Sequence, residues 1–228
     1  MNKILIETVN VKKTYQHFNG NITLFNNLNL KIKQGDLVAL VGPSGSGKSS
    51  LLHLLALLDE PTRGNIKIND VYTKEFTDEK KDETRRKNIS IIFQDNNLLN
   101  DFTAIENVMM PLIIKGENLV NAKKEAQKIL KVVKILNRAQ HFPNELSGGE
   151  QQRVAIARAL IAETNLILAD EPTGNLDFKT SKEIFSYFIK LKKLKKTIIF
   201  ATHNRELANR ADYKLLISNG DIKRVNAR

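Results

Sequence analysis

The order of apolar and polar residues near the amino terminus predicts exposed β-structure. Ile4 to Val9 and Leu24 to Ile32 alternate between apolar and polar at every second residue, which is typical of strands with one face in water. Between them, residues 17 to 21 carry Asn and Gly, which favour turns. We therefore expect an antiparallel β subdomain at the start of the chain.

Continuous apolar runs predict a second kind of strand, one that is covered on both faces. Such runs occupy Leu37 to Val41, Ile89 to Phe93, Leu166 to Ala169 and Thr197 to Thr202. Strands of this kind are typical of parallel sheets, because helices then pack on both faces. Shorter strands are expected at 65 to 69 and 214 to 218.

Helical periodicity fills most of the remaining chain and makes the fold class α/β. The predicted helices are Ser49 to Leu58, Lys123 to Leu136, Gln151 to Ala162 and Lys179 to Leu194. Alternation of strands and helices indicates right-handed crossovers and a mostly parallel core sheet. We expect one domain over residues 1–228, with a core at 1–93 and about 146–228 and an inserted helical subdomain at about 94–145. The polar stretch Thr73 to Lys87 carries no predicted element.

Composition narrows the classes of function. The 228 residues include no cysteine, which excludes a disulfide scaffold, a thiolate zinc site and a cysteine nucleophile. The net charge of +11 suits nucleic acid or an anionic membrane surface. However, Trp is absent and aromatic residues do not interleave with basic ones, so we expect no nucleic-acid partner. No apolar run reaches the roughly 20 residues of a membrane span, and no signal-peptide core is present, which predicts a soluble or peripheral protein.

A phosphate-binding loop lies between the first buried strand and its helix. The segment Gly42 to Ser49 matches the pattern G-x-x-x-x-G-K-[ST] in the strand–loop–helix context that this pattern requires. Glycines let successive backbone N–H groups point at phosphate oxygens, and the helix adds the positive end of its dipole. We expect Lys48 to bridge the β- and γ-phosphates of a nucleotide, and the Ser49 hydroxyl to bind Mg²⁺.

Two carboxylates follow the apolar run that ends at Ala169. Asp170 stands at the carboxyl end of a predicted buried strand, where α/β proteins bind ligands. It could hold Mg²⁺ through water. Glu171 follows on the opposite side of the chain and could act as the general base that orients the attacking water.

A second candidate anion site begins a helix further along the chain. Residues 146–153, Leu-Ser-Gly-Gly-Glu-Gln-Gln-Arg, resemble the signature segment of ATP-binding-cassette (ABC) ATPases. Ser147 and two glycines open a helix, and one chain cannot use this terminus and the Lys48 loop on opposite sides of one γ-phosphate. The resemblance implies that two chains stack head to tail as a homodimer. Each Ser147 loop then covers the ATP held by the Lys48 loop of the partner.

The same resemblance supplies the remaining site residues. Tyr15 resembles the aromatic residue that stacks on adenine, Gln94 the glutamine that meets Mg²⁺ or water, and His203 the histidine that reaches the γ-phosphate. The resemblance implies that ATP binds to Tyr15, Gly42, Pro43, Ser44, Gly45, Ser46, Gly47, Lys48, Ser49 and Ser50, and that the partner's ATP contacts Ser147, Gly148, Gly149 and Glu150. It places Asn175 and Asp177 at the dimer interface. It also implies that Mg²⁺ is held by Ser49, Gln94 and Asp170, and that the catalytic residues are Glu171, His203 and Gln94.

Three segments indicate a branch of this family. Residues 50–62, 97–108 and 202–208 are most similar to the ATP-binding subunits of lipoprotein-releasing systems. That branch implies integral membrane permease subunits as partners, a place on the cytoplasmic face of the inner membrane, and no direct contact with the transported lipoprotein. Macrolide or peptide exporters and a cell-division ATPase share the first two segments, so efflux and ATP-dependent assembly for cell division stay open. The apolar residues of Leu98 to Met110 are a candidate groove for the permease, or else subdomain core.

Overall fold

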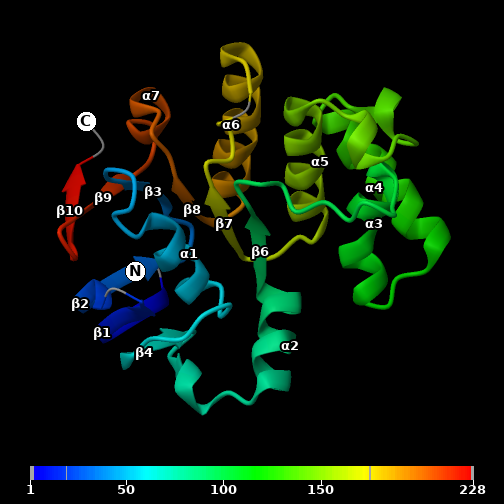
Figure 1. Ribbon diagram of the computed structural model, residues 1–228. Coiled ribbons are helices and arrows are strands. Elements are labelled where there is room, and N and C mark those ends of the chain that lie inside the picture. Colours follow the sequence, from blue (N-terminus) through cyan, green and yellow to red (C-terminus); the bar gives the residue numbers. More distant parts are fainter. Residues whose placement is uncertain (1–2, 19, 175, 227–228) are drawn as a thin grey trace.

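A computed structural model describes residues 3–18, 20–174 and 176–226. Within these ranges the strands form a four-stranded antiparallel sheet and a six-stranded sheet that is mostly parallel (Figure 1). Helices lie between and beside the sheets, and a group of helices stands to one side of the larger sheet. The predicted fold class is therefore confirmed.

The smaller sheet gathers the strands of the amino-terminal region in the order β2-β1-β4-β5. Its strands are β1 (Ile4–His17), β2 (Gly20–Lys33), β4 (Arg63–Ile68) and β5 (Val71–Tyr72). The first two strands are longer than predicted. Asn10 has a φ of 49°, and the register of β1 shifts on both sides of it, so the bulge interrupts the alternation that the prediction depended on.

The larger sheet brings the predicted functional loops to one edge. In the order β10-β9-β3-β8-β7-β6, only β9 and β10 pair antiparallel. The strands are β3 (Leu37–Val41), β6 (Ile89–Ile92), β7 (Leu166–Asp170), β8 (Thr197–Ala201), β9 (Tyr213–Ser218) and β10 (Asp221–Asn226). Because β3, β6, β7 and β8 run parallel, the loops that follow them all leave from the same edge.

Helices supply the rest of the described structure. They are α1 (Lys48–Leu55), α2 (Asp78–Asn88), α3 (Ala104–Ile114), α4 (Leu119–Val132), α5 (Gly148–Ile161), α6 (Phe178–Lys193) and α7 (Arg205–Ala208), with 3₁₀ turns at Thr73–Glu75, Leu136–Arg138 and Pro143–Glu145. Between β6 and α5, every regular element of the described chain is helical, as predicted for the inserted subdomain.

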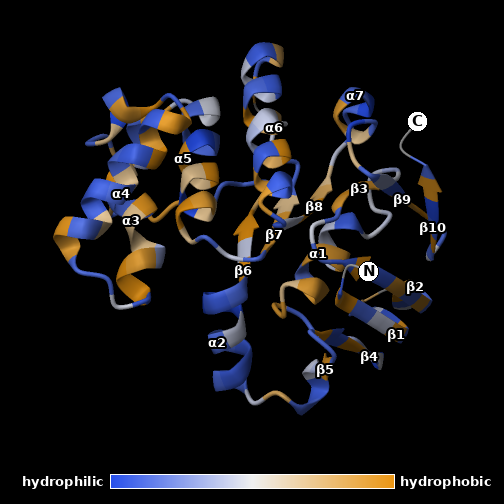
Figure 2. Cartoon of the chain, turned by 180° about the vertical axis from the view of Figure 1, so that it is seen from behind, coloured by the Kyte–Doolittle hydropathy of each residue, from blue (hydrophilic) through white to orange (hydrophobic). Residues whose placement is uncertain are grey.

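Helix α2 occupies part of the stretch that carried no predicted element. It has almost no apolar face, and Figure 2 shows it as a largely hydrophilic helix. Local contacts hold it instead: the Thr77 hydroxyl caps its first turn, and Lys80 and Lys87 form ion pairs with Glu83 at helical spacing. These lysines lower the pKa of Glu83 to about 2. Apolar periodicity could not have revealed a helix of this kind.

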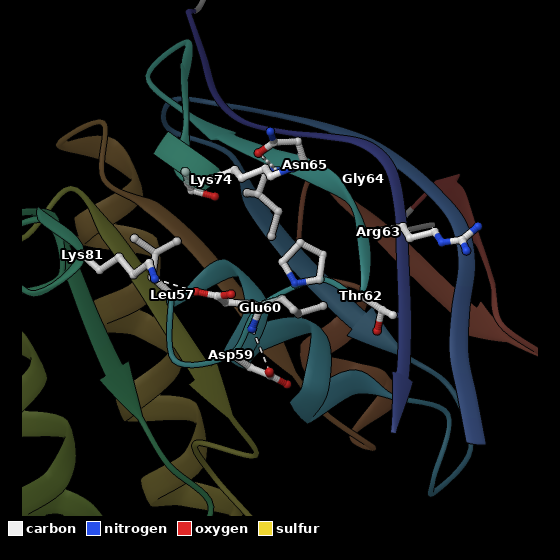
Figure 3. A pocket seen from close by; sticks show the side chains of 13 residues that line it. Leu57, Asp59, Glu60, Thr62, Arg63, Gly64, Asn65, Lys74 and Lys81 are labelled. Atoms are coloured by element: carbon white, nitrogen blue, oxygen red, sulfur yellow. Dashed lines mark hydrogen bonds and ion pairs between the residues drawn. The ribbon is translucent and has the colours of Figure 1, made fainter. Parts of the chain in front are cut away.

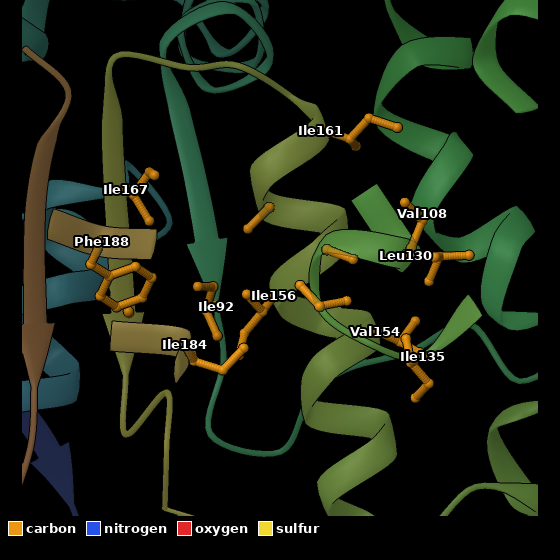
Figure 4. Close-up of a cluster of buried hydrophobic side chains, with 14 of the residues drawn as sticks. Ile92, Val108, Leu130, Ile135, Val154, Ile156, Ile161, Ile167, Ile184 and Phe188 are labelled. Atoms are coloured by element: carbon orange, nitrogen blue, oxygen red, sulfur yellow. The ribbon is translucent and has the colours of Figure 1, made fainter. Parts of the chain in front are cut away.

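One apolar core joins the larger sheet to the helical subdomain. Ile92 from β6 and Ile184 from α6 meet Ile156 of α5, while Val108 and Leu130 pack on the other side of the same helix (Figure 4). Helix α5 therefore links the helical subdomain to the sheet, and α6 contacts the subdomain too, through the hydrogen bond from the Tyr187 hydroxyl to the Val132 carbonyl oxygen at 2.7 Å. This matters for the site because α5 begins with the Ser147 segment.

Three phenylalanines lie at the centre of this core. Phe185 and Phe188 of α6 pack against Phe200 of β8, and the rings of Phe185 and Phe200 meet edge to face with centroids 5.3 Å apart. All three side chains are buried. Edge-to-face pairs of this kind add to the free energy gained by removing the rings from water.

We predict that Phe200→Ala lowers the free energy of unfolding by about 3–5 kcal/mol, because it leaves a cavity under α6. Phe178→Ala is the matched control, since Phe178 is 61% exposed, and its effect should stay within about 0.5 kcal/mol. Denaturant unfolding of both variants measures the difference. Equal losses in the two variants would contradict the core that we describe.

Candidate active site

The loop between β3 and α1 forms a cradle of backbone groups. Helix α1 starts directly after Gly47, which has a φ of 99° and has no side chain to cap the helix. A Cβ at Gly47 would lie 2.9 Å from the Phe25 ring, and one at Gly42 would lie 2.5 Å from the carbonyl oxygen of Ile217. A larger residue at either position would therefore distort the loop. Because no side chain caps α1, its first-turn N–H groups are free for an anion.

Lys48 and Ser46 are poised inside this loop. The Lys48 side chain is buried, and its Nζ donates to the carbonyl oxygens of Gly42 and Pro43, both at 3.0 Å. The hydroxyl of Ser46 is buried without a hydrogen-bond partner. The buried ammonium group of Lys48 fits a phosphate group, which would accept hydrogen bonds from it.

Asp170 and Glu171 leave the sheet two strands away from β3. Asp170 ends β7, and Glu171 follows in a left-handed backbone conformation with a φ of 46°. The Glu171 N–H donates to the carbonyl oxygen of Ala201, at 3.1 Å, so the turn is anchored to β8. The two carboxylates are close enough for the charge of Asp170 to contribute to the raised pKa of Glu171.

The Glu171 carboxylate is paired loosely with His203. The backbone N–H of His203 donates to Oε2 at 3.4 Å, and Nε2 lies 3.5 Å from Oε1. That second distance allows an ion pair but no good hydrogen bond, and Oε1 is buried without a partner. Burial raises the pKa of Glu171, and the charge of His203 opposes this rise. An unpaired carboxylate oxygen of raised pKa suits a general base that accepts a proton from water.

Tyr15 belongs to a small polar network at the end of β1. Its hydroxyl donates to Oδ2 of Asp59 at 2.7 Å, and the buried Lys13 holds the other oxygen of Asp59 at 2.5 Å. Burial raises the pKa of the Tyr15 hydroxyl, which also interacts with Ser50 on α1. Tyr15 therefore lies beside the start of the phosphate-loop helix, with 36% of its surface exposed for a planar ligand.

Gln94 follows β6 at the same edge of the sheet and is exposed. The next turn contains Asn96 and Asn97, both with left-handed backbone, at φ 59° and 45°. Arg158 of α5 donates to their two carbonyl oxygens, at 2.8 and 2.7 Å. This guanidinium ties the segment after Gln94 to α5, a link that no sequence pattern indicated.

The Ser147 segment lies away from the phosphate loop of its own chain. Ser147 caps α5, and a Cβ at Gly148 would meet nothing within 4 Å, so this terminus is open. Three strand spacings, about 14 Å, separate β3 from β6. Helix α5 lies beyond β6 in both Figure 1 and Figure 2. The two candidate anion sites are therefore not brought together within one chain.

The remaining predicted residues are placed less directly. Asp177 caps α6 by accepting from the Thr180 N–H at 3.0 Å, which gives it a structural role. Asn175, the other residue predicted at the dimer interface, lies outside the described residues. His203 borders an open hollow of about 540 Å³ that extends from Gly42 to Lys214.

A separate pocket of about 360 Å³ lies between β4, the end of α1 and α2. Figure 3 shows Glu60 and Lys81 paired at its wall, with Asp59 beneath them. It touches α1 at Leu54, about 10 Å along the helix axis from the phosphate loop, and extends to Leu57 beyond the end of the helix. It is therefore not the nucleotide cradle.

Comparison with known proteins identifies the family. The sequence pattern of the ABC transporter family matches residues 25–174, which is more than half of the chain. The chain belongs to the ABC transporter family. Similar curated proteins include the lipoprotein-releasing system ATP-binding protein LolD of Rickettsia bellii, 49% identical over 94% of this chain and 96% of that one, and LolD of Legionella pneumophila strain Paris, 40% identical over 97% and 98%.

Solved ABC cassettes have the same fold. The dimeric structure of the cassette MJ0796 matches 98% of this chain and 99% of its own, with 39% identity and a TM-score of 0.95. A dimeric post-hydrolysis state of MJ0796 bound to ADP and Pi matches over the same shares, with 38% identity and a TM-score of 0.95. These neighbours and the geometry above make this chain an ATPase cassette of the ABC family.

None of the helices in the described ranges combines the length and apolar character that a bilayer span requires. Nor do three or more His, Cys, Asp or Glu side chains of those ranges gather into a metal cage. A cation that binds with a nucleotide needs fewer protein ligands, because phosphate oxygens supply the rest. Ser49, Gln94 and Asp170, with one carboxylate and two neutral oxygens, have the hard-oxygen chemistry that Mg²⁺ prefers.

We predict an acid limb in the pH profile of kcat that lies above the usual glutamate range. Glu171 must be ionised to accept a proton, and its raised pKa means that activity is lost as the pH falls through that raised value. His203→Ala removes the charge that lowers this pKa, so the acid limb should move to higher pH. The maximal kcat of this variant should also fall. Steady-state ATPase assays across pH measure both proteins. A limb that stays in place, or moves down, would contradict the coupling.

Proposed function

We propose that this chain is the ATP-hydrolysing subunit of an inner-membrane transporter that releases lipoproteins toward the outer membrane. It would work as a homodimer on the cytoplasmic face, bound to integral membrane permease subunits, without touching the lipoprotein itself. The observation that carries the proposal is the match to lipoprotein-releasing ATP-binding proteins along nearly the whole length of both chains. No observation favours efflux or cell-division assembly over this role.

Hydrolysis follows from the groups that surround the cradle. Lys48 and the loop N–H groups bind the β- and γ-phosphates, and Tyr15 stacks on adenine. Glu171 accepts a proton from water as the water oxygen bonds to the γ-phosphorus. The bond from that phosphorus to the bridging oxygen breaks, leaving ADP and phosphate. His203 orients the carboxylate and contacts the γ-phosphate.

Ser49, Gln94 and Asp170 would hold Mg²⁺ beside the same phosphates. When bound, this ion neutralises charge on the β- and γ-phosphate oxygens. Ser49 stands at the start of α1 and Asp170 at the end of β7. Ser49 and Asp170 therefore both lie at the edge of the sheet where the phosphate loop is.

The open terminus at Ser147 would close the site of a second copy. Its N–H groups carry the positive end of the α5 dipole, but within one chain they lie beyond β6 and far from Lys48. Head-to-tail stacking would bring each Ser147 loop against the γ-phosphate of the partner. Hydrolysis then removes the contact that holds the two copies together.

A hollow of about 440 Å³ between the sheet edge and the helical subdomain suits the permease. Its lining includes the apolar Phe93, Pro111 and Ile114, the cations of Arg85, Arg86 and Arg158, and one carboxylate, Asp82, which pairs with Arg85. Apolar and basic groups in one hollow fit an amphipathic helix with acidic residues. Of the groove residues proposed from sequence, Leu99 and Phe102 are exposed but do not line this hollow, whereas Ile105 and Val108 are buried in the subdomain core.

We predict that Glu171→Gln binds ATP, loses turnover and accumulates as a dimer. The amide keeps the shape of the carboxyl group but accepts no proton, so the γ-phosphate persists between the copies. Adding Ser147→Arg should abolish this dimer while ATP binding remains, because the bulky side chain fills the open terminus. Sedimentation with ATP measures both effects. ATP-dependent dimers in the double variant would refute the sandwich.

We predict that depletion of this protein in its own cells leaves outer-membrane lipoproteins in the inner membrane. Wild-type protein should restore sorting, while Glu171→Gln should not, because release needs hydrolysis. Membrane fractionation with detection of a resident outer-membrane lipoprotein gives the result. Normal lipoprotein sorting together with macrolide sensitivity or blocked division would replace this role with one of the alternatives.

A further inference from the structure

The signature serine is occupied by a carboxylate of its own helix. Oε2 of Glu150 accepts from the Ser147 N–H at 2.8 Å and from the Ser147 hydroxyl at 2.9 Å. The Glu150 N–H points back at the Ser147 Oγ, at 3.4 Å, so the two residues form a capping box. The cap holds the first turn of α5 in place. It also sets a negative charge at the terminus that would receive a phosphate.

The charge of Glu150 affects the proposed contact between the Ser147 terminus and the γ-phosphate bound by the partner. A carboxylate one turn from an incoming γ-phosphate repels it, and the repulsion is strongest where stacking excludes water. A Cβ at Gly148 would meet no atom within 4 Å, so the terminus is open on that side. The α5 dipole therefore favours binding of a phosphate at this terminus, whereas the charge of Glu150 opposes it. A nearby cation would offset the charge of the carboxylate.

Arg138 is placed to do this. Its Nε donates to Oε1 of Glu150 at 3.0 Å, the oxygen that the cap leaves free. The Glu150 side chain is 19% exposed and that of Arg138 is 42% exposed, so the ion pair lies at the surface of the chain. The hydrogen bonds from Ser147, and then Arg138, lower the pKa of Glu150, which keeps it ionised.

The backbone around Arg138 is anchored firmly enough to hold this geometry. Arg138 ends the 3₁₀ turn Leu136–Arg138, and its N–H donates to the carbonyl oxygen of Ile135 at 3.0 Å. Ile135 and Ala139 on either side are buried in the subdomain core. A second guanidinium nitrogen lies 3.1 Å from Nε2 of His141, whose carbonyl oxygen accepts from the Ala104 N–H of α3.

We propose that Arg138 is a positioning residue that neutralises the Glu150 carboxylate, so that the Ser147 terminus can accept the γ-phosphate bound by the partner. The inference rests on the sandwich of the proposed function. It adds a residue from outside every recognised motif, and it treats the acidic residue of this signature as a charge that must be balanced. It predicts that the need for Arg138 depends on the charge at position 150.

The test uses ATP-dependent dimerisation in the Glu171→Gln background, followed by sedimentation across ATP concentrations. Arg138→Ala should raise the ATP concentration for half-maximal dimer by about tenfold, as expected for one uncompensated charge near the phosphate. Glu150→Gln alone should lower that concentration. Combined with Arg138→Ala, it should return the concentration to that of the parent or below, since no carboxylate remains to be balanced.

Two further substitutions separate charge from hydrogen bonding. Arg138→Lys keeps the cation and should stay near the parent, whereas Arg138→Gln keeps a donor without charge and should behave like Arg138→Ala. Because the repulsion is screened by salt, the deficit of Arg138→Gln should shrink as ionic strength rises. Lys128→Ala is the matched control, because it removes an ion pair with Glu125 on the same subdomain and should leave dimerisation unchanged.

The outcomes are distinct. An Arg138→Ala deficit that Glu150→Gln does not suppress would overturn the proposal and would mean that Arg138 binds the ligand itself or only supports the fold. The proposal is also overturned if Arg138→Ala dimerises like the parent, or if its loss tracks a lower melting temperature that Arg138→Gln shares. If the parent itself fails to dimerise with ATP, the sandwich is wrong, and this inference falls with it.

Discussion

The terminal phosphate of ATP has three oxygens that can accept hydrogen bonds from different directions, whereas the candidate phosphate-binding groups of this chain lie on one side of it. The Lys48 loop and the ends of β7 and β8 all lie at a single edge of the sheet. The other candidate anion site of the chain, at Ser147 at the start of α5, lies beyond β6 (Figure 1 and Figure 2). This separation supports the proposed homodimer, because a second copy can bring its Ser147 terminus to the γ-phosphate that the first copy binds.

Two glutamates at this site illustrate how surroundings decide the role of a carboxylate. Glu171 is half-buried, one of its carboxylate oxygens is buried without a partner, and its pKa is raised, which suits proton transfer. Glu150 accepts two hydrogen bonds from Ser147 and one from Arg138, and its pKa is lowered, which suits a fixed charge. The surroundings of Glu171 therefore suit the proposed general base, and those of Glu150 suit the fixed charge that the proposed role of Arg138 balances.

The sequence predicted the elements that depend on apolar periodicity and on local motifs. The run Leu37 to Val41 became β3 with the same bounds, and the phosphate-loop pattern lies between a strand and a helix, as expected. Helix α2 was missed because ion pairs and a cap hold it, without an apolar face. β10 was missed because only two of its residues are half-buried and it pairs as an edge strand.

The same limit applies to the site. Each motif residue could be named from its neighbours in sequence, but the residues that support the motifs come from distant segments. Lys13 and Asp59 meet across 46 positions, and Arg158 reaches back 62 positions to Asn96. Arg138 lies in a short 3₁₀ turn with no pattern around it. Only the packing of the helical subdomain brings it to Glu150.

The most direct measurement is a structure of the Glu171→Gln protein with ATP and Mg²⁺. The account predicts two copies related by a twofold axis, with each γ-phosphate held between Lys48 of one copy and Ser147 of the other. A nucleotide bound to an isolated copy, with its γ-phosphate open to solvent and with scattering from solution in agreement, would contradict it.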